Sequence, residues 1–379
     1  MKQRALAYRA LKHPVWTLAL AVLLVRGTAR AQWQIENSGT AADLRGIDNV
    51  GGGIAWASGT NGTVLRTEDG GYLWQNCTVP PGAEHLDFRG IQAFDANTAI
   101  VMSSGKGDLS RLYKTTDGCQ TWKLLFTNPD QDGFWDAMLL NRFDKDGYLL
   151  GDPVNGSFRF WTTEDKGTTW QDRWQDANWK QTAWKGLSAL PDEGAFAASN
   201  SALFVDERYA IGFITGGPSG GRLLLADDMN DGSRFHAVIL PLRNGSAFSG
   251  AFSIESRDWD GLVVVGGDYT KPDNTSGTAA YSKDGGEHWT SSATPPHGYR
   301  SAVAWDAASK TWITVGPNGT DISTDDGRNW RAVHPDPMLK EAPDADRDWN
   351  ALSLPFVVGP QGRIGKLDAG ALRANSGKN

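Results

Sequence analysis

Short apolar runs separated by glycine-bearing turns make up most of this chain. Runs rich in β-branched, leucine and aromatic residues flank pairs such as Asn61-Gly62. Such pairs favour hairpins because both residues accept the positive φ of tight turns. No stretch sustains the 3.6-residue period of an amphipathic helix, so the pattern predicts an all-β protein. The segments are WASGTNGTVLRT (56–67), AIVMSSGKGDLSRLYKT (99–115), LLGDPVNGSFRFWTT (149–163), GFITGGPSGGRLLLA (212–226) and WITVGPNGTDIST (312–324).

An eight-residue motif, Ser/Thr-x-Asp-x-Gly-x-x-Trp, follows each of these hairpins, and its recurrence predicts a repeated structural unit. The copies are TEDGGYLW (67–74), TTDGCQTW (115–122), TEDKGTTW (163–170), SKDGGEHW (282–289), STDDGRNW (323–330) and an eroded sixth, DMNDGSRF (228–235). The aligned polar residues are Asp69, Asp117, Asp165, Asn230, Asp284 and Asp325. The aligned aromatic residues are Trp74, Trp122, Trp170, Phe235, Trp289 and Trp330.

A second recurring signal predicts the first strand of each unit: an aromatic residue or leucine, then often a basic residue, then a small one. It occurs at LRGI (44–47), FRGI (88–91), FWDA (134–137), WKGL (184–187), FSGA (248–251), YRSA (299–302) and WNAL (349–352). Four-stranded units with a period of about 45 to 50 residues are typical of propeller blades.

The last predicted blade lacks a Trp-ended motif after FVVGPQGRIGKL (356–367). The segment WQI (33–35), which precedes the first blade, resembles the segments that follow other copies of the motif. We therefore expect the N-terminal strand to complete this blade and close the ring. The predicted fold is a seven-bladed β-propeller of four-stranded antiparallel blades, forming a single domain over residues 32–368.

Residues 1–31 have the features of a secretory signal peptide. Basic residues precede the apolar run VWTLALAVLLV (15–25), and the segment ends in ARA (29–31). This run is shorter than the roughly 20 residues that a membrane-spanning helix needs. We expect cleavage near Gln32, a periplasmic or secreted monomer without a transmembrane segment, and a disordered tail over residues 369–379.

The acidic charge of the chain narrows the choice of partner. There are 37 Lys and Arg against 44 Asp and Glu, and six of the basic residues lie in residues 1–31, so the remainder carries a net charge of −13. A nucleic-acid partner, which needs a basic face, is disfavoured. Cys77 and Cys119 are too few for a disulfide framework, and the sequence leaves open whether they form one bridge.

The repeated motif and the strand-start signal resemble those of Asp-box (bacterial neuraminidase) repeat proteins, and within them the photosystem II stability/assembly-factor-like propellers. The resemblance covers nearly all of residues 33–368. It implies the propeller fold and a protein-binding or assembly role. Sialidases, other glycosidases and sorting receptors share the box, so the resemblance to the motif says more about fold than about activity.

The motif itself is predicted to be structural. It lies between the third and fourth strands of each blade, at the bottom of the ring, whereas the inner strands begin at the top. There Asp accepts backbone hydrogen bonds, Gly adopts a strained conformation and Trp covers the turn. The segments at 227–232 and 344–349 do not follow the EF-hand order, and the histidines show no zinc-site spacing. We expect no metal and no cofactor.

The top face is the predicted binding face, because loops on a rigid scaffold usually carry binding residues. The second position of the strand-start signal holds Arg45, Arg89, Trp135, Lys185, Ser249, Arg300 and Asn350. If the basic residues surround the channel mouth, they form an anion site for an acidic protein segment or an anionic glycan. Alternatively, they are neutralised by Asp87, Asp136, Asp348 and other loop carboxylates.

Two functions remain after these steps. The first is a non-catalytic protein-binding or assembly factor that uses the top face. The second is an exo-acting glycoside hydrolase that resembles sialidases, in which Arg45, Arg89 and Arg300 would hold a substrate carboxylate. The conceivable catalytic groups for this second function are Asp152, Glu255, Asp268 and Tyr269, since glycosidic chemistry normally needs two placed carboxyl groups.

Overall fold

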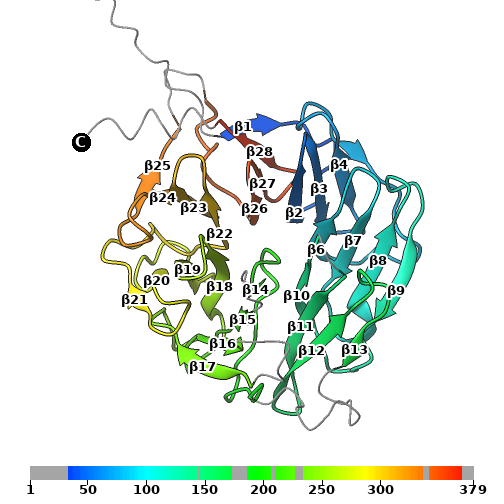
Figure 1. The fold of residues 1–379 in the computed structure, drawn as a ribbon. Helices are drawn as coiled ribbons and strands as arrows, with labels where there is room; N and C mark the ends of the chain where they lie inside the picture. The colour runs from blue at the N-terminus through cyan, green and yellow to red at the C-terminus, as the bar shows by residue number, and fades with distance from the viewer. Residues whose placement is uncertain are drawn as a thin grey trace, which may run out of the picture.

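The computed structural model describes residues 33–142, 145–172, 186–205, 210–226, 234–335 and 341–368, and it is a ring of seven β-sheets around a central axis (Figure 1). Each sheet consists of four antiparallel strands, and in six of the seven sheets these strands are consecutive in the chain. The predicted all-β, seven-bladed propeller is therefore confirmed. The expected signal peptide (1–31) and C-terminal tail (369–379) lie outside the described residues.

The blades are numbered in chain order, and the strands of each blade run from the axis outward. Blade 1 contains β2 (Leu44–Gly51), β3 (Ile54–Gly59), β4 (Val64–Thr67) and β5 (Gln75–Asn76). Blade 2 contains β6 (Phe88–Ala93), β7 (Ala99–Ser103), β8 (Arg111–Thr115) and β9 (Lys123–Thr127), with the 3-10 helix η1 (Gly107–Leu109) between β7 and β8. Blade 3 contains β10 (Trp135–Leu140), β11 (Gly147–Val154), β12 (Ser157–Thr163) and β13 (Gln171–Asp172).

The second half of the ring repeats this arrangement. Blade 4 contains β14 (Leu203–Val205), β15 (Ile211–Ile214), β16 (Arg222–Ala226) and β17 (His236–Ile239). Blade 5 contains β18 (Ser249–Ser256), β19 (Leu262–Asp268), β20 (Ala279–Ser282) and β21 (Thr290–Ser291). Blade 6 contains β22 (Ala302–Asp306), β23 (Thr311–Gly316), β24 (Gly319–Ser323) and β25 (Arg331–Val333). Blade 7 contains β26 (Ala351–Ser353), β27 (Phe356–Val358), β28 (Ile364–Leu367) and the N-terminal β1 (Trp33–Glu36).

The hydrophobic core lies between neighbouring blades. Middle strands such as β7 and β12 are buried along their whole length, because blades cover both of their faces, whereas the outermost strands are largely exposed. One cluster joins blades 3, 4 and 5 through residues such as Phe160, Phe213 and Val264. This continuous packing makes the ring a rigid scaffold for the loops at its two ends.

The N-terminal strand closes the ring. β1 pairs antiparallel with β28, with Trp33 opposite Leu367, so blade 7 combines both ends of the propeller (Figure 1). Trp33 is buried against Trp349, with ring centroids 6.0 Å apart, and its indole Nε1 donates a hydrogen bond to Thr320 Oγ1 at 3.0 Å. The closure predicted from WQI (33–35) is thus confirmed.

Blade 4 begins later in the chain than the sequence signal suggested. Its inner strand is β14 and not the WKGL segment at 184–187. The carbonyl of Leu187 accepts a hydrogen bond from Phe158 N at 2.9 Å, and Ser188 forms a bridge with Ser157, so this backbone is already paired with blade 3. The described part of this segment therefore belongs to a long connection toward blade 4.

Copies of the eight-residue motif form the same turn at the bottom of their blades. In the first copy, Thr67 Oγ1 donates to Asp69 Oδ1 at 2.9 Å, and the backbone N–H groups of Gly71 and Leu73 donate to Thr67 Oγ1 and Asp69 Oδ1, both at 3.0 Å. Asp117, Asp165, Asp284 and Asp325 accept equivalent bonds in their own copies. Phe235 of the eroded copy is buried in the core, and Asn230 lies outside the described residues.

The tryptophans of the motif cap these turns in two ways. Trp170, Trp289 and Trp330 each donate from Nε1 to the backbone carbonyl of the motif glycine. Trp74 instead donates to Glu36 Oε2 of β1 at 2.9 Å, and Trp122 donates to the carbonyl of Thr78 at 2.9 Å. The first two blades therefore use their motif tryptophans to hold neighbouring segments.

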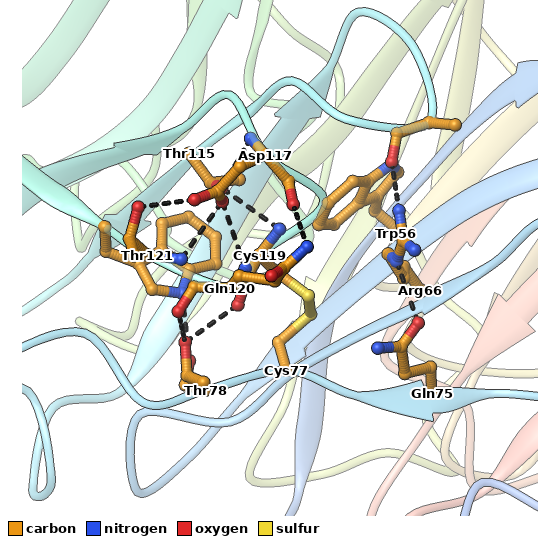
Figure 2. Close-up of a disulfide and its surroundings, with 12 residues drawn as sticks. Trp56, Arg66, Gln75, Cys77, Thr78, Thr115, Asp117, Cys119, Gln120 and Thr121 are labelled. Carbon is orange, nitrogen blue, oxygen red and sulfur yellow. Dashed lines mark hydrogen bonds between the residues drawn. A yellow bond between two sulfur atoms is a disulfide. The ribbon is translucent and has the colours of Figure 1, made fainter.

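Cys77 and Cys119 form a disulfide, which answers the question that the sequence left open (Figure 2). Cys77 directly follows β5 of blade 1, and Cys119 occupies the glycine position of the motif in blade 2. Cys119 adopts a φ of 64°, in the left-handed region that favours glycine. The bridge therefore connects two neighbouring blades at the outer edge of the ring.

Asp69→Ala is expected to lower the melting temperature by a few degrees at neutral pH, because Leu73 N–H and the Thr67 hydroxyl lose their acceptor. These bonds, that from Leu73 first, hold the pKa of Asp69 below its ordinary 3.8. A depressed carboxyl pKa contributes stability that is lost as the pH falls through the folded-state value. Calorimetry at neutral and strongly acidic pH should therefore show the difference shrinking in acid. Asp69→Asn, which keeps one acceptor oxygen, is the control, and an unchanged neutral melting temperature for Asp69→Ala would contradict the structural role.

Candidate functional site

A hollow of about 480 Å³ lies at the mouth of the ring on the top face, and we call it the mouth hollow. Its walls come from the first residues of inner strands, from the turns between second and third strands, and from the connections between blades. The motif turns lie at the opposite end of the ring. The mouth hollow is therefore the place where a ligand would contact several blades at once. Its lining residues are Arg45, Arg89, Phe134, Asp136, Asp152, Ala195 to Ala198, Phe252, Tyr269, Tyr299, Ser301, Pro317, Trp349 and Asn350.

Bulges in the inner strands decide which side chains reach the mouth hollow. The strand-pairing register skips Arg45 in β2, Arg89 in β6, Asp136 in β10 and Phe252 in β18. A bulge re-aims the side chain of the extra residue and breaks the alternation of the strand. These four residues all line the mouth hollow. The bulges of four blades therefore supply both of its arginines, one of its two carboxyl groups and one of its aromatic rings.

Arg45 and Arg89 share one carboxylate. Arg89 Nε lies 2.8 Å from Asp87 Oδ2, and Arg45 Nε lies 3.9 Å from Asp87 Oδ1. Arg89 Nη1 also donates to the carbonyl of Ala197 at 3.2 Å, whereas the buried Nε of Arg45 makes no hydrogen bond. The two side chains are 31% and 30% exposed. Asp43 Oδ2 also lies 4.0 Å from Arg45 Nη2, but both carboxylate contacts of Arg45 are longer than a hydrogen bond, so donor capacity remains for a ligand oxygen.

Asp136 and Asp152 place two carboxyl groups in the same mouth hollow. Asp136 is 1% exposed and its Oδ2 has no hydrogen-bond partner, while Asp152 Oδ1 accepts from Ala195 N at 3.0 Å. Burial and the neighbouring charge of Asp152 raise the pKa of Asp136 well above its usual range. Burial raises the pKa of Asp152 to about 6. One or both carboxyls can therefore hold a proton near neutral pH.

Aromatic rings from three blades form the remaining wall. Phe196 stacks on Phe252 with centroids 3.9 Å apart, and Phe252 meets the edge of Tyr299 at 4.8 Å. Tyr269 contacts both Phe252 and the rim residue Phe248, at 6.1 Å and 5.5 Å. Tyr269 and Phe248 are nearly half exposed. The wall thus runs from the floor of the mouth hollow out to solvent.

Three of the sequence-predicted ring residues lie away from the mouth hollow. Trp135 is fully buried between blades 2 and 3, stacked on Phe126 at 5.3 Å, because the bulge places Asp136 where the sequence register placed Trp135. Ser249 is buried at the start of β18. Arg300 is buried in blade 6. Lys185 lies outside the described residues, whereas Asn350 lines the mouth hollow and donates from Nδ2 to the carbonyl of Leu44 at 2.8 Å.

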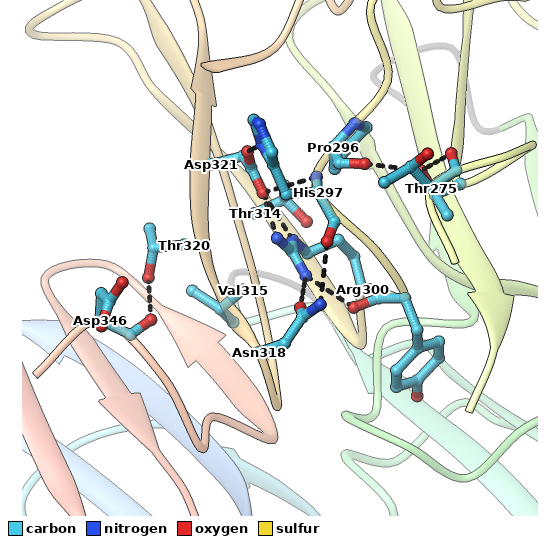
Figure 3. A network of polar contacts seen from close by, with 12 residues as sticks. Thr275, Pro296, His297, Arg300, Thr314, Val315, Asn318, Thr320, Asp321 and Asp346 are labelled. Carbon is cyan, nitrogen blue, oxygen red and sulfur yellow. Dashed lines mark hydrogen bonds and ion pairs between the residues drawn. The ribbon is translucent and has the colours of Figure 1, made fainter. Parts of the chain in front are cut away.

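Arg300 belongs to an ion-pair network inside blade 6 (Figure 3). It is 1% exposed and forms two hydrogen bonds to Asp321 Oδ2, the one from Nε at 2.9 Å. Nη1 donates to Asn318 Oδ1 and to the carbonyl of Tyr299. His297 Nδ1 lies 2.6 Å from the other oxygen of Asp321. All of these contacts satisfy the guanidinium within the fold, so a ring of four basic residues does not form among the described residues.

The arrangement expected for a sialidase-like site is not assembled by its candidate residues. Arg45, Arg89, Asp152 and Tyr269 line the mouth hollow, but Arg300 is sequestered by Asp321. Glu255 and Asp268 lie outside its lining, and burial raises the pKa of Glu255 to about 7. Within the described ranges, no group of three or more His, Cys, Asp or Glu side chains is placed to hold a metal ion. No helix in the same ranges is long and apolar enough to cross a membrane.

Sequence reasoning named Asp136 only as a counter-ion for the basic residues, and it missed Phe252 and the segment around Phe196. A weak signal for Asp136 was present in FWDA (134–137), where two adjacent aromatic residues allowed two registers and only the bulge selects one. Residues 195–198 belong to a connection without a repeat signal, so nothing in their pattern marked them as part of the site.

Comparisons with known proteins identify the fold. No family model and no curated protein sequence matches the chain. Among solved structures, YCF48 bound to D1 peptide aligns with a TM-score of 0.60 and 16% identity, over 89% of this chain and 96% of the other. YCF48 from Cyanidioschyzon merolae gives 0.56 and 18%, over 89% and 99%. The extracellular domain of the putative one component system BT4673 from B. thetaiotaomicron gives 0.57 and 11%, over 88% of this chain and 40% of that one. At these sequence identities the structural likeness supports the propeller fold alone, so the function has to be argued from the residues of the site.

Proposed function

We propose that this protein is a non-catalytic binding factor that holds a segment of another protein in the mouth hollow, in the manner of an assembly factor. The observation that carries the proposal is the placement of Arg45 and Arg89 at the bulges of adjacent blades, in one hollow with aromatic side chains, where neither carboxylate near Arg45 is within hydrogen-bond distance of it. Two guanidinium groups with remaining donors bind a carboxylate of a peptide well.

The likeness to YCF48 bound to D1 peptide supports this proposal, because it shows that a propeller of this architecture takes a peptide ligand. The sequence resemblance to photosystem II assembly-factor-like propellers points the same way. The signal-peptide features of residues 1–31 favour a periplasmic or secreted site of action. A rigid ring whose loops form a binding surface at one end is well suited to holding a partner during assembly.

Replacing both Arg45 and Arg89 by alanine is expected to weaken partner binding by roughly tenfold to a hundredfold, since charge-assisted hydrogen bonds are lost. The measurement is a quantitative pull-down from the periplasmic fraction of the source cells with the protein lacking residues 1–31. A binding titration with each recovered partner then gives the dissociation constant.

Arg257→Ala is the matched control for that experiment. Arg257 is 29% exposed and carboxylate-paired, with Nε 2.9 Å from Asp258 Oδ2, but it lies away from the mouth hollow. Partners retained by Arg257→Ala and lost by the double variant would support the proposal. Partners bound equally by all three proteins would overturn it.

A further inference from the structure

A second depression adjoins the mouth hollow over blades 3 and 4, and we call it the side groove. Its volume is about 850 Å³, and it shares Asp152, Ala195 and Phe196 with the mouth hollow. Its described lining carries acidic residues and no lysine or arginine. Pro153, Leu190 and Pro191 supply apolar surface between the charges. The two depressions therefore form one continuous path across the top face.

Some acidic groups along this path are already paired. Glu193 accepts hydrogen bonds from Arg222 Nε at 2.8 Å and Thr215 Oγ1 at 2.6 Å, so it serves the fold. Asp132 lies 2.8 Å from Lys106 Nζ. Asp136 differs from both. It lines the mouth hollow, only 1% of its surface is exposed, and its Oδ2 has no hydrogen-bond partner. Asp152, at the junction of the two depressions, is bonded by one backbone N–H.

The local charge balance favours a cation at this junction. Asp87 lies between Arg45 and Arg89, and Asp43 Oδ2 lies 4.0 Å from Arg45 Nη2, so two carboxylates already face the two arginines. Asp136 and Asp152 lie in the same mouth hollow as this balanced group, so the ionised form of either carboxyl adds net negative charge at the junction. The Asp136 carboxyl interacts with the charge of Arg89 and with the backbone N–H of Asp152, but its buried Oδ2 has no hydrogen-bond donor, and a ligand cation at that oxygen supplies one. The electron-rich faces of Phe252, Tyr269 and Tyr299 in the same mouth hollow also attract a cationic head group.

We propose that the bound protein segment carries a lysine or arginine, whose cationic head lies against Asp136 and Asp152 beside the aromatic wall. The flanking chain of the segment occupies the side groove, and an acidic group of the segment reaches Arg45 and Arg89. The top face thus selects a segment that carries both charges, and the basic residue of the segment determines which segments bind. This inference rests on the proposed function, because it assigns the chemistry of the partner at the same site.

The test uses a library of short random peptides displayed on phage, selected separately on the wild type, Asp136→Asn, Asp152→Asn and Arg45→Ala/Arg89→Ala. Asparagine keeps the shape of the side chain and removes a buried charge, so both variants should fold, which a thermal melt verifies. Lysine and arginine should be enriched in peptides selected on the wild type. That enrichment should disappear on Asp136→Asn, and a synthetic copy of a selected peptide should bind this variant at least roughly tenfold more weakly.

Asp326→Asn, a change at an exposed aspartate in the motif of blade 6, is the control and should select the same basic peptides as the wild type. Peptides without basic enrichment that depend on Arg45 and Arg89 would overturn this inference and leave the proposed function standing. Peptides that bind all variants equally, or no selection at all on the folded wild type, would overturn both.

Discussion

Arg300→Ala is expected to lower the free energy of unfolding by about 3 to 5 kcal/mol, because it leaves Asp321 as a buried carboxylate without its counter-ion. Both side chains are almost fully buried, and Arg300 makes two hydrogen bonds to Asp321 Oδ2. His297 alone would remain beside the carboxylate, and its side chain is 57% exposed. Urea denaturation of the wild type and the variant measures the difference.

Two further variants sharpen that measurement. In Arg300→Met/Asp321→Leu both charges are removed, so much of the lost stability should return. Arg347→Ala removes an arginine that is 49% exposed and lies 3.5 Å from Asp346, and it should cost no more than about 1 kcal/mol. A loss of less than 1 kcal/mol on Arg300→Ala, or a double variant less stable than the single, would contradict the structural role assigned to Arg300.

Trp33→Ala is expected to destabilise the protein by about 3 to 5 kcal/mol, the usual cost of removing a large buried aromatic side chain. Trp33 is 2% exposed, packs on Trp349 and bonds Thr320 of the neighbouring blade, so its loss weakens the closing strand and its contact with blade 6. Urea denaturation followed by circular dichroism gives the free-energy change, and limited proteolysis shows whether the N-terminal strand is released first.

Ile35→Ala provides the comparison within the same strand. Ile35 is 40% exposed, so its replacement should cost well under 1 kcal/mol. If Trp33→Ala were no more destabilising than Ile35→Ala, β1 would not be the closing element of the ring in solution.

The repeat made most of the fold predictable because each blade repeats the same local physics. The motif Asp and Gly specify one turn, and the Trp that follows marks the outer strand, as in Asp69, Gly71 and Trp74. The missing last copy correctly indicated that Trp33 completes blade 7. The error in blade 4 arose because WKGL copies the strand-start pattern in a segment whose backbone pairs with blade 3.

The site was less predictable than the fold, because it depends on register and on pairing partners. A shift of one residue in the strand register decides whether a side chain points into the core, as Trp135 does, or into the mouth hollow, as Asp136 does. Arg300 has the sequence context of Arg45 and Arg89, but it forms a buried ion pair with Asp321 on a strand of the same blade. The bulge leaves only an ambiguous signal in FWDA (134–137) and the ion pair leaves none, so an alignment of strand starts does not show which side chain reaches the mouth hollow.

The pairing of β1 with β28 also sets the order of events during synthesis. β1 is the first strand of the propeller to be made and β28 the last, so a growing chain can build blades 1 to 6 only as an open arc. Closing a loop that contains the whole domain is slow compared with forming the local hairpins. The apolar cluster around Trp349 and Ile313 includes Trp33 of the N-terminal strand, so it is complete only after β1 has paired with β28. The mouth hollow therefore acquires its full wall only when the two ends of the propeller have met, because Arg45 belongs to blade 1 and Asn350 to the start of blade 7.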